Sequence, residues 1–392
     1  FCFIMTNLVS EMNTSLLAQR VTTSRLLGQD PHLVLYGGGN TSLKATDPAT
    51  GRQFLWVKGS GYDLADITVE GFTKLPNTEL LALLAAADFG DVEMMDRLNA
   101  LKCDASMPSP SVEALMHAVI PYAFVDHTHA SSVVTLTNTE GGLEVLARLF
   151  PDFLIVPYQM AGKLLSIQIA ELVDQDISRY KGIILQHHGV VTYSDDAEVS
   201  CQRMIDCEQK AADYLSEWPI NLVQSKPSNG VQNTLELKNT LEQKYQRPVF
   251  VQKFISQVSE QFSVNKPWRE AASRGTLTPE HVIRLKPFPM VVTTDVSLAL
   301  DSFQHAYQQY FATHHEPKHI RLSDLPKWCI VENEGVFAIS FDEAELEIIE
   351  AIANENMQAM AKAETISQWQ PLPEAELFAI EYWELEQRKL KK

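Results

Sequence analysis

The chain of 392 residues is 45% hydrophobic and 21% charged, the composition of a folded globular protein, which excludes disordered, collagen-like and membrane-spanning chains. Its length predicts two or three domains with a substantial core. The formal charge of -18 repels nucleic acids and anionic membrane surfaces. Small anionic substrates are not excluded, because backbone N–H groups in loops and at helix starts bind phosphate locally.

The first half of the chain alternates between helical and strand patterns. Residues 11–27 predict a helix that ends at Gly28. Short apolar runs predict strands over residues 33–36, 42–45, 54–57, 123–127, 133–136, 153–156 and 182–186. Helical periodicity covers residues 78–102, the segment after Pro110 and the segment that begins near Asp195. This alternation predicts one α/β domain over residues 1–222.

A polar stretch over residues 223–245, with Pro and Gly near its start, predicts a linker. Beyond it, residues 246–392 alternate again and predict a C-terminal α/β domain. The strands are expected over 289–293, 328–331 and 336–340, and the long helices over 297–312 and 342–366.

Two segments of these domains resemble each other. Residues 182–198 and 328–345 both predict a strand, a turn before Gly189 or Gly335, a second strand and a long helix. We interpret the C-terminal domain as a degenerate repeat in which Glu334 replaces His188. The alternative is independent convergence on a common strand-turn-strand-helix pattern.

The cysteines and the N-terminus predict a cytoplasmic protein. Five scattered cysteines without a CxxC pair indicate a reducing compartment. The apolar start at Phe1 is too short for a signal peptide, and Met5 is a candidate for the native start. The sequence contains no apolar run of roughly 20 residues that would span a bilayer.

Three histidines have the spacing of a metal site. His127 and His129 project from one face of a predicted strand, because side chains alternate along it. His188 lies at the end of another predicted strand and offers a third imidazole. Together the three imidazoles would make an open site for a divalent metal. The alternative for each histidine is a hydrogen-bonded structural role.

The segment from Ser109 predicts a helix start with Pro110 at the first helical position. Its free N–H groups and the Ser111 hydroxyl could hold an anion. Glu113 and His117 are spaced i and i+4 and share one helix face. Alternatively, Glu113 is an ordinary first-turn acid that the helix dipole favours.

The order and spacing of five motifs resemble the class II aldolase/adducin family over about residues 20–215. These motifs are Gly38-Gly39-Asn40-Thr41-Ser42, Lys58-Gly59-Ser60-Gly61, Pro110-Ser111-Val112-Glu113, His127-Thr128-His129-Ala130 and His188-Gly189. The resemblance implies an α/β/α domain with a central, largely antiparallel sheet, followed here by the C-terminal α/β extension.

Residues 27–31 and 381–387 further resemble the aldolase portion of bifunctional rhamnulose-1-phosphate aldolase/short-chain dehydrogenase proteins. The sequence stops at Lys392 without the dehydrogenase. A separate dehydrogenase acting on the aldehyde product is therefore an expected partner.

The resemblance implies roles for individual residues. His127, His129 and His188 match the zinc ligands, and Glu113 matches the catalytic acid/base. The residues that match the phosphate-binding set are Asn40, Ser60, Gly61 and Ser111. Val112 stands where fuculose-phosphate aldolases have a second serine, which removes one phosphate hydrogen bond. Tyr158 resembles a tyrosine that a neighbouring subunit supplies as proton donor.

Together these features predict a zinc-dependent aldolase, although another divalent transition metal would also fit the ligands. The expected reaction cleaves a ketose 1-phosphate, such as rhamnulose or fuculose 1-phosphate, to dihydroxyacetone phosphate and an aldehyde. A sugar-phosphate epimerase or dehydratase on the same site, or a non-catalytic adducin-like binding module, are the alternatives. The resemblance also implies a homo-oligomer with a small phosphorylated sugar as substrate. The net charge predicts no nucleic acid or membrane partner.

Overall fold

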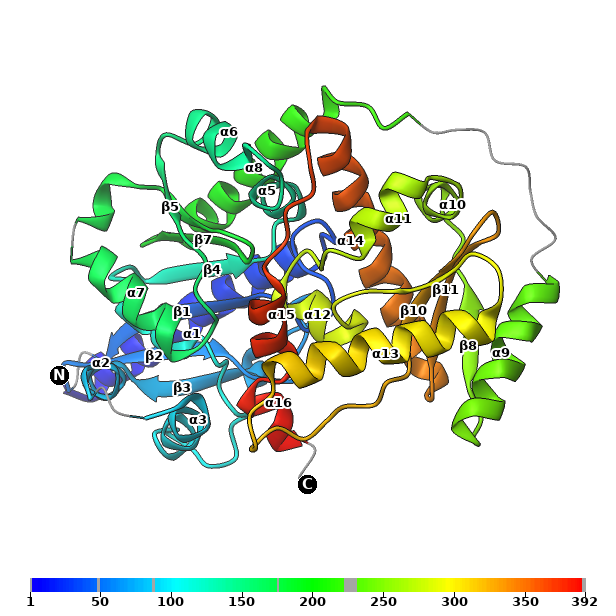
Figure 1. Cartoon of the computed structure of the whole chain (residues 1–392). Coiled ribbons are helices and arrows are strands. Elements are labelled where there is room, and N and C mark those ends of the chain that lie inside the picture. Colours follow the sequence, from blue (N-terminus) through cyan, green and yellow to red (C-terminus); the bar gives the residue numbers. More distant parts are fainter. Residues whose placement is uncertain (1, 48–49, 87–88, 175, 222–230, 390–392) are drawn as a thin grey trace. The chain divides into compact units, whose positions relative to one another are not determined.

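The computed structural model describes residues 2–47, 50–86, 89–174, 176–221 and 231–389. These residues form two compact units (Figure 1). The first contains Phe1–Val133 and Leu146–Ala212, and the second contains Val134–Val145 and Asp213–Lys392. None of the described helices is long and apolar enough to cross a membrane.

A seven-stranded sheet in the order β3-β2-β1-β4-β7-β6-β5 forms the centre of the first unit (Figure 1). Its strands are β1 (Asn40–Asp47), β2 (Arg52–Lys58), β3 (Phe72–Pro76), β4 (Phe124–Thr128), β5 (Phe153–Val156), β6 (Gly182–Leu185) and β7 (Gly189–Ser194). The β5/β6 pair is parallel, and the other neighbours in this sheet are antiparallel. The expected largely antiparallel sheet is therefore confirmed.

Helices cover both faces of this sheet, which confirms the α/β/α arrangement. One face packs against α2, α4 and α7 through two apolar clusters. On the other face, side chains of α1 and α8 contact β4 and β7. The helices of this part are α1 (Cys2–Gly28), α2 (Asn77–Ala85), α3 (Asp91–Ala100), α4 (Ala114–Val119), α5 (Ser131–Thr137), α6 (Gly142–Leu149), α7 (Lys163–Val173) and α8 (Ala197–Ser216). Short 3-10 turns lie at Val69–Gly71 and Ile177–Arg179.

Two of the strand predictions are wrong. Residues 33–36 form turns that follow α1, and residues 133–136 lie inside helix α5. Both segments are apolar because they are buried, as Leu33 and Val133 show. A short apolar run signals burial but does not distinguish a strand from a buried turn or helix.

The second unit contains a four-stranded sheet in the order β8-β11-β10-β9. Its strands are β8 (Phe250–Lys253), β9 (Met290–Val292), β10 (Trp328–Val331) and β11 (Gly335–Ser340). Its helices are α9 (Val231–Tyr245), α10 (Gln257–Val264), α11 (Lys266–Ala272), α12 (Pro279–Leu285), α13 (Val296–His314), α14 (Leu346–Ile366), α15 (Glu374–Glu381) and α16 (Glu384–Lys389), with a 3-10 turn at Glu343–Glu345. The expected C-terminal α/β domain is thus present.

The predicted linker over 223–245 needs a correction. Its first part lies largely outside the described residues, but residues 231–245 form helix α9. Leu237 and Leu241, one helical turn apart, are fully buried in the apolar core of the second unit. This i,i+4 pair anchors a helix in a segment whose overall polarity suggests a loop.

The C-terminal motif that begins at Glu381 is part of the second unit's interior. Glu381 Oε1 accepts hydrogen bonds from Tyr307 Oη at 2.8 Å and from Lys286 Nζ at 3.3 Å. The Tyr307 and Tyr382 hydroxyls are also 2.8 Å apart. These buried contacts fix the end of α15 against α13, which gives the motif a structural reason.

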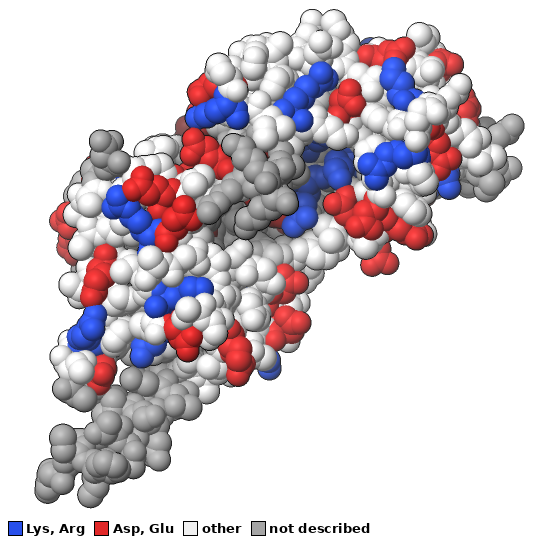
Figure 2. All heavy atoms as spheres, turned by 90° about the horizontal axis from the view of Figure 1, so that it is seen from below, with Lys and Arg blue, Asp and Glu red and all other residues white. Residues whose placement is uncertain are grey.

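Acidic and basic side chains are interspersed on the face of the molecule shown in Figure 2. On this face the excess of acidic residues does not form a single continuous patch. The net charge therefore does not by itself create a site for a cationic partner there.

A buried ion pair joins α1 to the central sheet of the first unit. Arg20 Nη2 lies 2.5 Å from Asp126 Oδ1, and both side chains are fully buried. The Ser200 hydroxyl donates to the other carboxylate oxygen at 2.5 Å. Asp126 precedes His127 in β4, so this pair supports the strand that carries two of the predicted metal ligands.

We expect Arg20→Met to lower the free energy of unfolding by about 3–5 kcal/mol, because it leaves the Asp126 carboxylate buried without its counter-ion. Chemical denaturation measures this loss. Arg52→Met is the matched control, since the Arg52–Glu79 pair is 55% and 40% exposed and such pairs contribute up to about 1 kcal/mol. Equal losses in the two variants would contradict the structural role of the buried pair.

Candidate metal centre and active site

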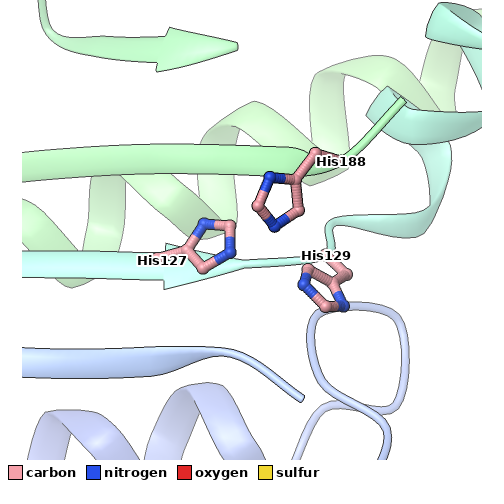
Figure 3. A group of neighbouring side chains, drawn as sticks. All are labelled: His127, His129 and His188. Carbon is pink, nitrogen blue, oxygen red and sulfur yellow. The ribbon is translucent and has the colours of Figure 1, made fainter. Parts of the chain in front are cut away.

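Three histidine side chains converge at one end of the central sheet (Figure 3). His127 is near the end of β4, His129 follows that strand, and His188 lies in the turn between β6 and β7. Because β4 pairs with β7, with Thr128 opposite Val190, this turn lies beside the end of β4. One nitrogen from each ring lies within 4.8 Å of the others. The three histidines can therefore share one metal ion.

The hydrogen bonding of His127 and the burial of His188 both suit metal binding. His127 Nδ1 lies 3.0 Å from the carbonyl oxygen of Val190, to which it donates, while its buried Nε2 has no hydrogen-bond partner. The lone pair of Nε2 thus faces the cluster, as in metal sites where a carbonyl fixes the tautomer. Burial, reinforced by His127, holds the pKa of His188 well below its usual range. Neutral imidazoles are the ligating form.

Glu113 lies directly beside two of these imidazoles. It precedes the first residue of α4, and its backbone N–H donates to the Ser111 hydroxyl at 3.2 Å. Its two carboxylate oxygens are each 3.5 Å from a ring nitrogen, Oε2 from His127 Nε2 and Oε1 from His188 Nε2. The carboxylate is buried, and Oε1 makes no hydrogen bond. A buried acceptor at this position is well placed to take or return a proton next to a metal.

The glycine-rich loop before β1 passes close to the histidines. Gly39 has φ +65°, and a β-carbon there would lie 2.9 Å from the carbonyl oxygen of His127. A β-carbon at Gly38 would lie 3.4 Å from His129 Nδ1. Only glycine gives the loop both this backbone conformation and this close approach. The loop therefore forms part of the wall of the metal centre.

Three of the four residues predicted to bind phosphate are brought together in neighbouring loops. The Ser60 N–H donates to the Ser109 carbonyl at 2.7 Å, and the Ser111 N–H donates to the Lys58 carbonyl at 3.0 Å. Ser60 and Gly61 are exposed, and Ser111 is half-buried. The loop after β2 and the segment before α4 thus lie side by side, and the hydroxyl groups of Ser60 and Ser111 are the donors that they could offer to an oxyanion.

The fourth residue, Asn40, has its side chain engaged elsewhere. Its Nδ2 donates to Glu113 Oε2 at 2.6 Å, and its Oδ1 lies 2.5 Å from His117 Nε2. Sequence reasoning noted that Glu113 and His117 share a helix face but did not predict that Asn40 links them. The i,i+4 spacing was the available signal, but a bridge across two elements requires the tertiary structure.

Tyr158 lies apart from the contacts described for Glu113. It follows β5, is half-buried, and its ring centroid is 6.4 Å from that of His187. His187 adopts φ +57° and is not among the three converging histidines. Burial lowers the pKa of His187 to about 4.

We expect His188→Ala to weaken divalent metal binding by a factor of at least about 100, because it removes one of three ligands. Titration of the metal-free protein with Co²⁺, followed by its visible absorption, measures the affinity. His187→Asn is the control, since asparagine tolerates a positive φ and His187 is not among the three converging histidines. A loss of affinity in the control as large as in His188→Ala would contradict this ligand set.

The chain is 28% identical over 397 residues to "Uncharacterized oxidoreductase YuxG" of Bacillus subtilis (strain 168), covering 94% of this chain and 57% of that protein. The chain thus spans little more than half the length of this curated relative.

Among solved structures, the N-terminal class II aldolase domain of a conserved protein from Thermoplasma acidophilum is 34% identical, covers 50% of this chain and 92% of that chain, and has a TM-score of 0.47. The L-fuculose-1-phosphate aldolase from Thermus thermophilus is 16% identical, covers 51% of this chain and 94% of that chain, and has a TM-score of 0.35.

Two family models match the chain in succession. Residues 232–390 match the second domain of class II aldolases, and residues 18–215 match the class II aldolase and adducin N-terminal domain. The second of these matches covers half of the chain and includes the three histidines and Glu113. The chain therefore belongs to the class II aldolase and adducin family.

Proposed function

We propose that this protein is a zinc-dependent aldolase that cleaves a ketose 1-phosphate, such as rhamnulose or fuculose 1-phosphate, to dihydroxyacetone phosphate and an aldehyde. The observation that carries the proposal is the Glu113 carboxylate, 3.5 Å from both His127 and His188. A buried acid/base beside three imidazoles that can hold a metal suits carbon–carbon cleavage next to a carbonyl. Membership of the aldolase family supports this assignment.

His127, His129 and His188 would hold the metal. When bound, a divalent ion supplies positive charge that stabilises the negative charge developing on the substrate oxygens during cleavage. Three neutral ligands leave that charge undiminished and leave coordination positions open. Zinc is the ion that we propose, because it prefers imidazole nitrogen and the site has three such ligands.

Glu113 would move the proton at the carbon next to the carbonyl. The Asn40 amide holds one of its oxygens at 2.6 Å, while the other has no hydrogen-bond partner in the described part of the chain. The second oxygen is thus available to the substrate. Its burial keeps bulk water from competing for the proton.

The exposed loop at Ser60 and Gly61, together with Ser111, would hold the substrate phosphate and fix its distance from Glu113. We assign Asn40 mainly to Glu113, although its amide nitrogen has a second N–H that could reach the phosphate. Tyr158 stays a proposal for the proton donor to the leaving aldehyde in a homo-oligomer. We place the protein in the cytoplasm, because its described cysteines are free thiols.

Metal-loaded protein should release dihydroxyacetone phosphate from at least one member of a panel of ketose 1-phosphates, and Glu113→Gln should lower kcat by about 10²–10⁴-fold through loss of the acid/base. A coupled assay for dihydroxyacetone phosphate measures both. Glu198→Gln, at an exposed position of α8, should keep the activity of the unmodified protein. Chelation of the metal should abolish turnover, and readdition should restore it.

Product analysis distinguishes the competing activities on the same site. An isomeric sugar phosphate would indicate an epimerase, and loss of water would indicate a dehydratase. Metal binding without turnover of any panel member would favour a non-catalytic module of the adducin type. Any of these three results would overturn the aldolase assignment.

A further inference from the structure

A continuous chain of short hydrogen bonds runs behind Glu113. The Ser42 hydroxyl is 2.7 Å from His117 Nδ1, His117 Nε2 is 2.5 Å from Asn40 Oδ1, and Asn40 Nδ2 is 2.6 Å from Glu113 Oε2. Ser42 and His117 are fully buried, and Asn40 and Glu113 are nearly so. The metal-centre chemistry proposed above does not account for His117.

The chemistry of the groups fixes the direction of this chain. A carboxylate only accepts, so the amide nitrogen of Asn40 must face Glu113 and its carbonyl oxygen must face His117. His117 must then donate from Nε2, and its Nδ1 must accept from the Ser42 hydroxyl. Burial, with Lys44, His127 and Arg20 adding to it, holds the pKa of His117 well below its usual range. A neutral ring carries a single proton, as this pattern demands.

The residues of this hydrogen-bond chain are held by strand β1 and helix α4. Asn40 and Ser42 project from the same face of β1, and Asn40 pairs with His127 across the β1/β4 ladder. His117 is one helical turn after Glu113 in α4, and Lys44 Nζ donates to its carbonyl oxygen at 2.6 Å. One turn of α4 is therefore tied to the strand beside the metal ligands.

We propose that His117 is a positioning residue, which orients the Asn40 amide so that it holds the Glu113 carboxylate at the metal centre. The inference rests on the proposed function, because it assigns to His117 the task of aligning the proposed acid/base. Without His117 the Asn40 amide can rotate, and Glu113 loses its fixed partner. The effect falls on proton transfer rather than on metal or phosphate binding.

Steady-state kinetics of two variants test this role. His117→Leu should lower kcat by about 10–100-fold while the KM and the bound metal stay within about twofold, since only alignment is lost. His117→Gln should recover most of kcat, because a glutamine amide can donate to Asn40 as Nε2 does. An unchanged kcat in His117→Leu, or no recovery in His117→Gln, would overturn the proposal.

A second measurement does not depend on activity. In metal-free protein labelled with ¹⁵N, the His117 ring should show a proton on Nε2 and none on Nδ1, and Asn40→Ala should shift the Nε2 signal. A proton on Nδ1 would overturn the hydrogen-bond chain. If the unmodified protein cleaves no ketose 1-phosphate, the proposed function fails. The tautomer of His117 would still show whether the hydrogen bonds from Ser42 to Glu113 run as inferred.

A separate observation concerns the second unit, whose sheet repeats half of the first. The strand orders β4-β7-β6-β5 and β8-β11-β10-β9 match, with the last pair parallel in each. The two hairpins also share one register: Leu185 pairs with Gly189 as Val331 pairs with Gly335. Helix α5 begins at Ser131 and α10 at Gln257, three residues beyond the end of β4 and four beyond that of β8.

The turns within the hairpins agree residue by residue. His187 and Asn333 occupy the same turn position and have φ of +57° and +61°. The residue before each of them donates its backbone N–H to the carbonyl oxygen at the end of the parallel strand. Gln186 donates to Val156 of β5 at 3.0 Å, and Glu332 donates to Val292 of β9 at 2.8 Å. Two hairpins that converged independently would not both have a non-glycine residue with positive φ at the same turn position. Nor would the residue before it donate its backbone N–H to the equivalent third strand in both.

This register places the second unit's counterparts of the metal ligands. Val191 pairs with His127, and its counterpart Phe337 pairs with Lys253. Two residues further on, Ile255 corresponds to His129. A β-carbon at Gly189 would lie 2.9 Å from His127 Cε1, and one at Gly335 would lie 2.7 Å from Lys253 Cε. His127 and Lys253 thus each pass close to the first glycine of the neighbouring strand, Gly189 or Gly335.

We infer that the second unit is a copy of the half of the first unit from β4 to α8, with Lys253, Ile255 and Glu334 in place of the three metal-binding histidines. Lys253 replaces a metal ligand with a positive charge, which disfavours a cation at this position. The protein should therefore bind one catalytic metal per chain, in the first unit.

Grafting tests this correspondence. In a His127→Ala/His188→Ala background, the triple substitution K253H/I255H/E334H should create binding for one Co²⁺ per chain with a tetrahedral absorption spectrum. The control, K253H/I255H/E334A, has only two of the three ligands, and it should bind at least about 100-fold more weakly. A folded graft, checked by circular dichroism, that binds no better than this control would overturn the correspondence.

A crystal structure provides the second test. The β-carbons of residues 253, 255 and 334 should superpose on those of 127, 129 and 188 when the two sheets are overlaid. If these positions were shifted along their strands by one or more residues in the overlay, the inference would be overturned.

Discussion

The pairing of β4 with its two neighbours is the constraint on which the site depends. On one side, β7 places the turn that carries His188 beside the end of β4. On the other side, β1 places Asn40 opposite His127. Backbone hydrogen bonds thus align the ligands and the partner of Glu113 before any metal binds, so that binding need not order the chain.

The buried polar groups around this sheet end support different parts of that arrangement. Arg20 and Asp126 tie α1 to β4 on one face. On the other face, Lys44 and Ser42 hold His117, and through Asn40 they reach Glu113. Each group has a partner, which is what permits so much polarity in a dry interior. The exceptions lie at the metal centre, where His127 Nε2 and one oxygen of the proposed catalytic carboxylate have no hydrogen-bond partner among the described residues.

The second unit shows what the same scaffold becomes without the histidines. Its hairpin keeps the register, the left-handed turn residue and the parallel neighbour. These features come from backbone hydrogen bonding, which tolerates many side chains. The ligands are side-chain features, and they can change without disturbing the sheet. The second unit therefore keeps the fold of the sheet without the side chains that would bind a metal.

The sequence by itself predicted which three histidines lie together, the alternation of helices and strands and the pattern of the two hairpins, because strand alternation and motif spacing are local. The layered arrangement followed from the family resemblance. The sequence also placed residues 33–36, 133–136 and 231–245 in wrong elements, since burial and polarity alone do not define backbone geometry. Only the tertiary structure decided that Asn40 holds Glu113 and that His117 holds Asn40. Those contacts join residues more than 70 positions apart, and their geometry is set by the packing of α4 against the sheet and not by any local pattern.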